Sequence, residues 1–218
     1  KDSPTIAVPE GEVRNGWFTA KGFDVIEDGD APNASLLGES QERFLEEWAN
    51  DWNEDVWMKV LLSQTPFACV QTLPVGAKGG VQPALTIFEP GGFAVDDVPC
   101  SDADSNGWPM TGRDRALGII QPAHVLHLCG DQHIGFAAQY GVESQRDGGV
   151  VFCSPAIANT WPRRWMPRDP ETNEPRPLGE HVDGFGNMVA IDAVANPFRR
   201  GHEPSALHDR SPGFGLVR

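Results

Sequence analysis

The apolar run from Val125 to Cys129 constrains the fold of this chain more than any other stretch. It predicts a short buried strand, and it leads directly into Gly130, Asp131 and His133. Open α/β sheets build their functional sites at the carboxyl ends of strands, where neighbouring strands open onto a shared crevice. We therefore expect a central strand that presents a carboxylate and an imidazole at its end.

Asp131 and His133 are two residues apart, which in extended backbone places both side chains on the same side of the chain. A carboxylate oxygen and a neutral imidazole suit Mn, Fe or Zn. The pair is therefore a candidate catalytic and metal-binding site. The residues also allow a simpler interpretation, because Gly-Asp after a strand is a common turn and His133 is then a surface histidine.

Periodicity predicts further elements of an α/β protein. Apolar residues recur with a period of 3.6 and predict a helix over about 39–53, whereas continuous apolar runs predict strands at 56–62 and 188–194. The first of these strands stops at polar residues, so Gln64 is a candidate to lie near the same crevice. A turn rich in Ser, Thr and Pro explains Gln64 equally well.

Residues 74–107 form a long excursion rich in Gly, Pro and Asp, and a helix is predicted to follow it over 112–121 with Thr111 as its N-cap. Arg113 and Arg115 lie in the first turns of this helix, where cations oppose the helix dipole. An anion held there by an arginine and free backbone N–H groups would explain the arrangement.

Composition narrows the functional classes. The chain has 218 residues, enough for one sizeable domain, and its 17 Lys and Arg against 31 Asp and Glu give a net charge of −14. This charge disfavours nucleic-acid binding, and a phosphate site would need metal ions or local arginines. No apolar run approaches the roughly 20 residues of a membrane span.

The four cysteines contain no CxxC pair, which excludes a structural zinc knuckle. Cys129 and Cys153 lie in apolar strand-like runs, where buried thiols are expected, and one disulfide among the four cysteines stays open.

Three segments resemble the PhoD-like alkaline phosphatases of the calcineurin-like metallophosphoesterase family. Residues 36–45 (LLGESQERFL) and 59–65 (KVLLSQT) resemble the family segment LGE-Q-x-x-(W/F)-L followed by W-K-V. Residues 104–113 (DSNGWPMTGR) resemble the D-x-W-x-G-Y-x-x-x-R region, and 128–133 (LCGDQH) resembles L-x-G-D-V-H. The segments occur in the family order and span about residues 36–135.

The resemblance implies a part of a two-sheet α/β sandwich flanked by helices, loop-rich in this chain. It implies hydrolysis of phosphomonoesters or phosphodiesters with divalent or trivalent metal ions, among them Fe, Mn, Ca or Zn. His133 would be a metal ligand and Asp131 a ligand or its close partner. Arg113 would contact the substrate phosphate or hold a carboxylate, and Gln64 would contact the substrate or serve as a weak neutral ligand. The resemblance also favours a periplasmic or secreted location.

The chain departs from the family in one large respect. The Gly-Asp strand end and the Gly-Asn-His/Asp turn, which supply most ligands in the family, have no counterpart before Leu36. We therefore expect residues 1–218 to be a single domain that corresponds to the C-terminal half of such an enzyme. We expect a further strand to begin near Gly213, and association either with a second copy or with an N-terminal half.

A second functional class competes with the hydrolase. An acidic, β-rich domain could recognise a glycan or a protein partner without catalysis, using Trp161, Trp165 and the nearby arginines. Metal binding through His133 separates the two classes, because only the hydrolase requires it.

Overall fold

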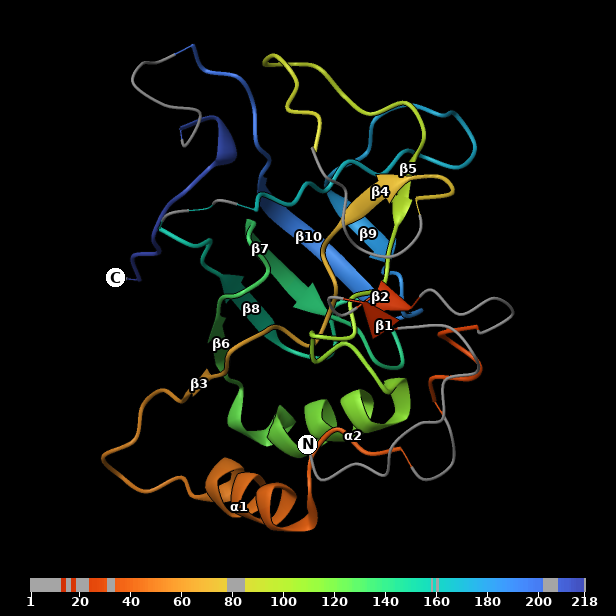
Figure 1. Cartoon of the computed structure of the whole chain (residues 1–218). Coiled ribbons are helices and arrows are strands. Elements are labelled where there is room, and N and C mark those ends of the chain that lie inside the picture. The colour runs from red at the N-terminus through yellow and green to blue at the C-terminus, as the bar shows by residue number, and fades with distance from the viewer. Residues whose placement is uncertain are drawn as a thin grey trace.

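The computed structural model describes residues 13–14, 17–18, 24–30, 34–77, 85–157, 159, 161–201 and 208–217. It has a mixed α/β architecture with one six-stranded sheet, which confirms the expected fold class (Figure 1). The helices are α1 (Glu39–Asn50) and α2 (Met110–Ile120), and the 3-10 turns are η1 (Gln121–Ala123) and η2 (His208–Arg210). The main sheet contains β3 (Val60–Leu62), β6 (Leu126–Cys129), β7 (Gly135–Tyr140), β8 (Val150–Cys153), β9 (Gly179–Val182) and β10 (Met188–Ala195). Two small hairpins pair β1 (Val13–Arg14) with β2 (Trp17–Phe18), and β4 (Thr72–Pro74) with β5 (Asp97–Pro99).

The main sheet has the strand order β3-β6-β8-β7-β10-β9. The first three strands run parallel, with Val60 beside Leu126 and Leu126 beside Val150, whereas β7, β10 and β9 continue the sheet by antiparallel pairing. Because parallel strands point the same way, the carboxyl ends of β3, β6 and β8 lie at one edge of the sheet. This edge carries Gln64 and the segment from Gly130 to His133.

Local patterning predicts the main elements but misses some of their bounds. The first helix ends at Asn50, because Asp51 leaves helical geometry and the Lys59 ammonium binds the carbonyls of Trp48 and Ala49. The run at 56–62 forms a strand only over its last three residues. Neither described helix is long and apolar enough to cross a bilayer.

Two expectations about chain ends and caps are wrong. Residues 213–217 are not a strand; Gly215 lies instead against the ring of Phe152. The second helix has Pro109 as its N-cap, and Thr111 lies inside the helix, where its backbone N–H and hydroxyl donate to the Asp30 carboxylate.

The excursion at 74–107 is anchored at its base, although residues 78–84 lie outside the described part of the chain. The carboxylate of Asp97 on β5 forms a bidentate pair with Arg164, with Nε and Nη2 distances of 2.7 and 2.6 Å. Both side chains are buried. The Thr72 hydroxyl donates to the same carboxylate at 2.7 Å. The hairpin of β4 and β5 is therefore fixed to the segment that precedes β9.

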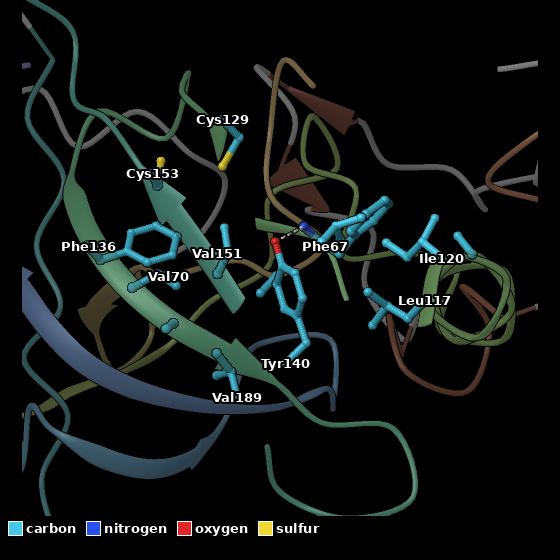
Figure 2. Close-up of a cluster of buried hydrophobic side chains, with 14 of the residues drawn as sticks. Phe67, Val70, Leu117, Ile120, Cys129, Phe136, Tyr140, Val151, Cys153 and Val189 are labelled. Atoms are coloured by element: carbon cyan, nitrogen blue, oxygen red, sulfur yellow. Dashed lines mark hydrogen bonds between the residues drawn. The ribbon is translucent and has the colours of Figure 1, made fainter. Parts of the chain in front are cut away.

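Helix α2 covers one face of the main sheet, and α1 packs against α2 and η1. Leu117 and Ile120 of α2 belong to one core cluster with Val151 and Cys153 of β8, and Figure 2 shows these side chains around Tyr140. The inward residues of β6 and β8 are buried, as expected for Cys129 and Cys153, and all four cysteines are free thiols.

The opposite face of the parallel strands is also apolar. Its outward positions are Val60 and Leu62 on β3, Leu126 and Leu128 on β6, and Val150 and Phe152 on β8. Leu62 is 75% exposed and Val150 is 46% exposed. Parallel sheets normally bury both faces. Gly215 lies against Phe152, but the outer face at Leu62 and Val150 is not covered by the described parts of the chain.

A buried polar chain centred on His127 crosses the core. The Phe67 N–H donates to the Tyr140 hydroxyl at 3.0 Å, and that hydroxyl lies 2.9 Å from His127 Nδ1. His127 Nε2 lies 2.7 Å from the Ser63 hydroxyl, which donates to the Thr65 carbonyl at 2.6 Å. Every group is satisfied only if Tyr140 donates to Nδ1 and Nε2–H donates to Ser63. In this arrangement the Ser63 hydroxyl accepts a hydrogen bond from His127, so His127 does not act as a base that activates Ser63 as a nucleophile.

We predict that residues 1–218 self-associate through the outer sheet face, since burial of exposed apolar surface there is favourable. Light scattering over a concentration series should give a mass above that of the monomer. Leu62→Lys should weaken association by about tenfold, or about 1.4 kcal/mol. The control is Val95→Lys, because Val95 is equally exposed at 75% but lies in the excursion. A wild-type chain that stays monomeric at high concentration would contradict the prediction.

The second prediction concerns His127. Burial lowers the pKa of His127 to about 4 from an ordinary value of 6.5. Between pH 4 and 6.5 the unfolded state binds more protons than the folded state, because His127 has its ordinary pKa only when the chain is unfolded. The free energy of unfolding should therefore fall by about 3 kcal/mol as the pH falls from 6.5 to 4. His127→Gln keeps a donor and an acceptor but does not titrate. Urea unfolding should show this loss in the wild type relative to the variant; equal pH dependence of the two proteins would refute it.

Candidate functional site

The carboxyl edge of the parallel strands brings together the ends of β3, β6 and β8. The Gly130 N–H donates to the Gln64 carbonyl at 3.0 Å, and the Ser154 N–H donates to the Cys129 carbonyl at 2.9 Å. The side chain of Gln64 is exposed. The structure therefore places Gln64 beside the turn that carries Asp131 and His133, as the shared pattern of strand and polar terminus predicts.

The backbone at Asp131 and His133 is not extended. Their φ angles are 63° and 55°, in the left-handed region, and the Gln132 N–H closes a tight turn onto the Gly130 carbonyl at 2.7 Å. The extended-strand argument for two side chains on one side therefore does not apply. Left-handed conformations cost about 1 kcal/mol or more in residues other than glycine, and they concentrate at functional sites.

The imidazole of His133 is oriented by Asn159. The Asn159 amide nitrogen donates to the carbonyls of His133 and Arg210, each at 2.8 Å, so its Oδ1 must face the imidazole. That oxygen lies 3.0 Å from His133 Nδ1 and can only accept, which places the proton on Nδ1. Nε2 therefore carries a lone pair to which no described residue donates, as in metal-binding histidines whose second nitrogen donates to a carbonyl oxygen.

The carboxylate of Asp131 is half-buried and has no hydrogen-bond or ion-pair partner among the described residues. An unpaired carboxylate in the same turn as an oriented imidazole can accept a cation. However, no group of three or more His, Cys, Asp and Glu with metal-binding geometry occurs in the described part of the chain. Asp131 and His133 thus provide at most two ligands.

A buried network behind this turn is not evident from the sequence. Gln132 is fully buried, and its Oε1 accepts from Arg163 Nη1 at 3.0 Å. Arg163 Nη2 pairs with the buried Asp102, and the Arg163 N–H donates to the His133 carbonyl at 3.3 Å. The network holds the turn of Asp131 and His133 against the excursion. Only the sheet topology brings these three distant segments together, so local patterning carries no signal for it.

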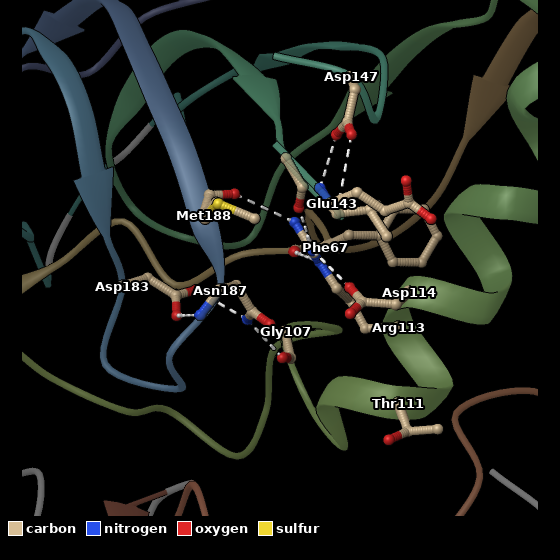
Figure 3. A network of polar contacts seen from close by, with 12 residues as sticks. Phe67, Gly107, Thr111, Arg113, Asp114, Glu143, Asp147, Asp183, Asn187 and Met188 are labelled. Carbon is tan, nitrogen blue, oxygen red and sulfur yellow. Dashed lines mark hydrogen bonds and ion pairs between the residues drawn. The ribbon is translucent and has the colours of Figure 1, made fainter. Parts of the chain in front are cut away.

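Arg113 does not lie at this edge. Its guanidinium is buried, donates to the carbonyls of Phe67 and Gly141, and pairs with Asp114 at 2.7 Å (Figure 3). Gly141 follows the carboxyl end of β7, which is antiparallel to β8, so Arg113 lies toward the amino ends of the parallel strands. The position of Arg113 thus does not support the expected contact with the substrate. The alternative, in which Arg113 holds a carboxylate, matches its ion pair with Asp114. Arg115 pairs with Glu42, so neither arginine supports an anion site at this helix.

The two tryptophans expected to form a binding surface differ in their exposure. Trp161 is 68% exposed, but Trp165 is fully buried and its indole N–H donates to the Pro177 carbonyl at 3.0 Å. Arg164 is engaged with Asp97. The expected recognition surface of two tryptophans and free arginines is therefore wrong in this form.

Comparison with known proteins gives limited information. No family model matches the sequence, and no curated protein matches it. Among solved structures, the chain is similar to the "Structure of PhoD", at 22% identity and a TM-score of 0.38. The match covers 59% of this chain and 22% of that chain, so this chain spans less than a quarter of the solved PhoD structure. A likeness of this extent assigns neither the fold nor the function of the chain.

We predict that neutral His133 carries its proton on Nδ1. Free histidine prefers the other tautomer, so long-range 1H–15N NMR spectra at high pH should distinguish His133 from the exposed His124. Asn159→Leu removes the acceptor and should return His133 to the Nε2–H form. A His133 that carries its proton on Nε2 in the wild type would remove the argument for a free ligand nitrogen.

Proposed function

We propose that this chain is part of a metal-dependent phosphoric ester hydrolase, with His133 and Asp131 as metal ligands. One observation carries the proposal: Asn159 leaves the Nε2 lone pair of His133 free, in the same strand-end turn as the unpaired carboxylate of Asp131. The left-handed backbone at both residues supports it, because such conformations are retained where they serve a site.

The donor set suits Mn, Fe or Zn, and Ca would draw on the carboxylate oxygen. A bound metal would polarise the phosphoryl group and lower the pKa of a bound water. It would also offset the net charge of −14, which otherwise repels a phosphate ester. Residues of this chain orient the ligands: the Asn159 side chain fixes the imidazole, and the backbone N–H of Arg163 binds the carbonyl of His133.

Gln64 is the proposed substrate contact at this edge. Its exposed side-chain amide can donate to a phosphoryl oxygen, and its backbone is tied to Gly130, next to Asp131. Arg113 has no part in the proposal, because it lies toward the other end of the parallel strands.

Two ligands do not make a dinuclear clamp, which needs several donors for each ion. Further ligands must therefore come from outside the described residues. We expect residues 1–218 alone to bind a metal weakly and to hydrolyse esters slowly or not at all.

The test combines metal binding and turnover. Titration calorimetry with Mn²⁺ on residues 1–218 should show binding that His133→Ala weakens by at least about tenfold, whereas His124→Ala, a matched change in a turn at the amino end of β6, should leave it unchanged. In the complete protein, hydrolysis of bis-p-nitrophenyl phosphate with Mn, Fe, Ca or Zn should fall by at least about 100-fold in His133→Ala. Wild-type turnover in His133→Ala would exclude His133 from the mechanism.

A further inference from the structure

A groove of about 600 Å³ lies between the excursion and β9, the edge strand farthest from β3. Its walls come from residues 95–99 around β5, from the loop at 167–176 and from residues 180–182 of β9. This size is typical of sites for small molecules. The groove is not used by the proposed hydrolase, and its lining indicates what it could bind.

The lining of the groove includes exposed valines. Val75, Val95, Val98 and Val182 are 65%, 75%, 42% and 52% exposed. Val75 follows β4 and Val98 lies in β5, whereas Val182 ends β9, so valines from both sides line the groove. Clustered apolar side chains in a concave surface favour a ligand with an apolar body.

The rim of the groove is richer in free negative charge than in free positive charge. The carboxylates of Asp96 and Glu180 have no partner among the described residues, and both residues are exposed. Arg176 pairs with Asp169 at 3.3 Å, which compensates both charges. Arg168 donates instead to the carbonyls of neighbouring residues in the wall. Among the described residues, the lining therefore carries two carboxylates without a partner, Asp96 and Glu180, and one guanidinium without a carboxylate partner, Arg168.

Two buried acceptors lie behind the rim, and no described residue donates to them. Gln145 Nε2 donates to the His181 carbonyl at 3.3 Å, which directs Gln145 Oε1 the other way, and no described residue binds that oxygen. His181 Nε2 is also unpartnered in the described structure, while the ring interacts with the Leu178 carbonyl. Burial lowers the pKa of His181, so the ring stays neutral and Nε2 is an acceptor.

We propose that this groove binds a small organic cation that combines an apolar body with an ammonium group. The exposed valines would receive the apolar body, and the ammonium donors would lie near the carboxylates of Asp96 and Glu180. Gln145 Oε1 and His181 Nε2 are covered by the protein and take no part in the contact. An added peptide strand fits less well, because Arg176 and Gln145 already bind the carbonyls of Glu180 and His181 on β9.

The test uses three probes of similar shape and different charge on the full chain: 2-phenylethylammonium, 2-phenylethanol and 3-phenylpropanoate. In 1H–15N NMR titrations the cation should shift the amides of Val95, Val98 and Val182 and bind most tightly of the three. Equal affinity of all three probes, or shifts outside these residues only, would overturn the proposal.

Matched variants isolate the rim charge. The double variant Asp96→Asn and Glu180→Gln should bind the cation about threefold or more weakly and bind 2-phenylethanol unchanged. The control is Glu171→Gln with Glu174→Gln, which removes the same charge from exposed positions that do not line the groove. Val98→Lys should abolish binding of the cation. If the control pair weakens binding as much as the rim pair, only the overall charge matters and the proposal fails.

Discussion

The imidazole of His127 fixes the edge of the sheet on which the candidate site depends. Its two nitrogens join Ser63, at the end of β3, to Tyr140, at the end of β7, across the core. Because the Ser63 hydroxyl also donates to the Thr65 carbonyl, the turn that carries Gln64 is fixed in its position beside β6. A buried polar chain of this kind is stabilising only when every member is satisfied, and here every member is. The strand-end geometry thus depends on one neutral histidine.

The turn after β6 is held from two further sides. Asn159 binds both the side chain and the backbone of His133, and Arg163 joins Gln132 to the buried Asp102. These contacts offset the cost of two left-handed residues. They also leave Nε2 of His133 and the Asp131 carboxylate without partners among the described residues. A turn that is restrained everywhere except at two ligand atoms is the physical basis of the proposed metal site.

The sequence predicts what depends on local periodicity. The helix beginning at Glu39 and the strand ending at Cys129 follow from apolar spacing alone, and Gly130 marks where polar residues begin. It does not predict the left-handed backbone of His133 or its contact with Asn159, which is 26 residues away. Likewise the position of Arg113 in the sequence predicts that it binds an anion, but in the fold its guanidinium donates to backbone carbonyls of the core. Topology decides these cases, and topology is not a local property.

The exposed apolar residues on the parallel strands and the two-ligand site both fit the proposal that this chain is part of a larger enzyme. The central claim is that His133 and Asp131 share a metal. Diffraction from crystals soaked in Mn²⁺, recorded for anomalous scattering, tests this most directly. The account predicts a peak about 2.0–2.3 Å from His133 Nε2 and beside the Asp131 carboxylate. A peak only at other residues, or Nε2 bound as a hydrogen-bond donor, would contradict it.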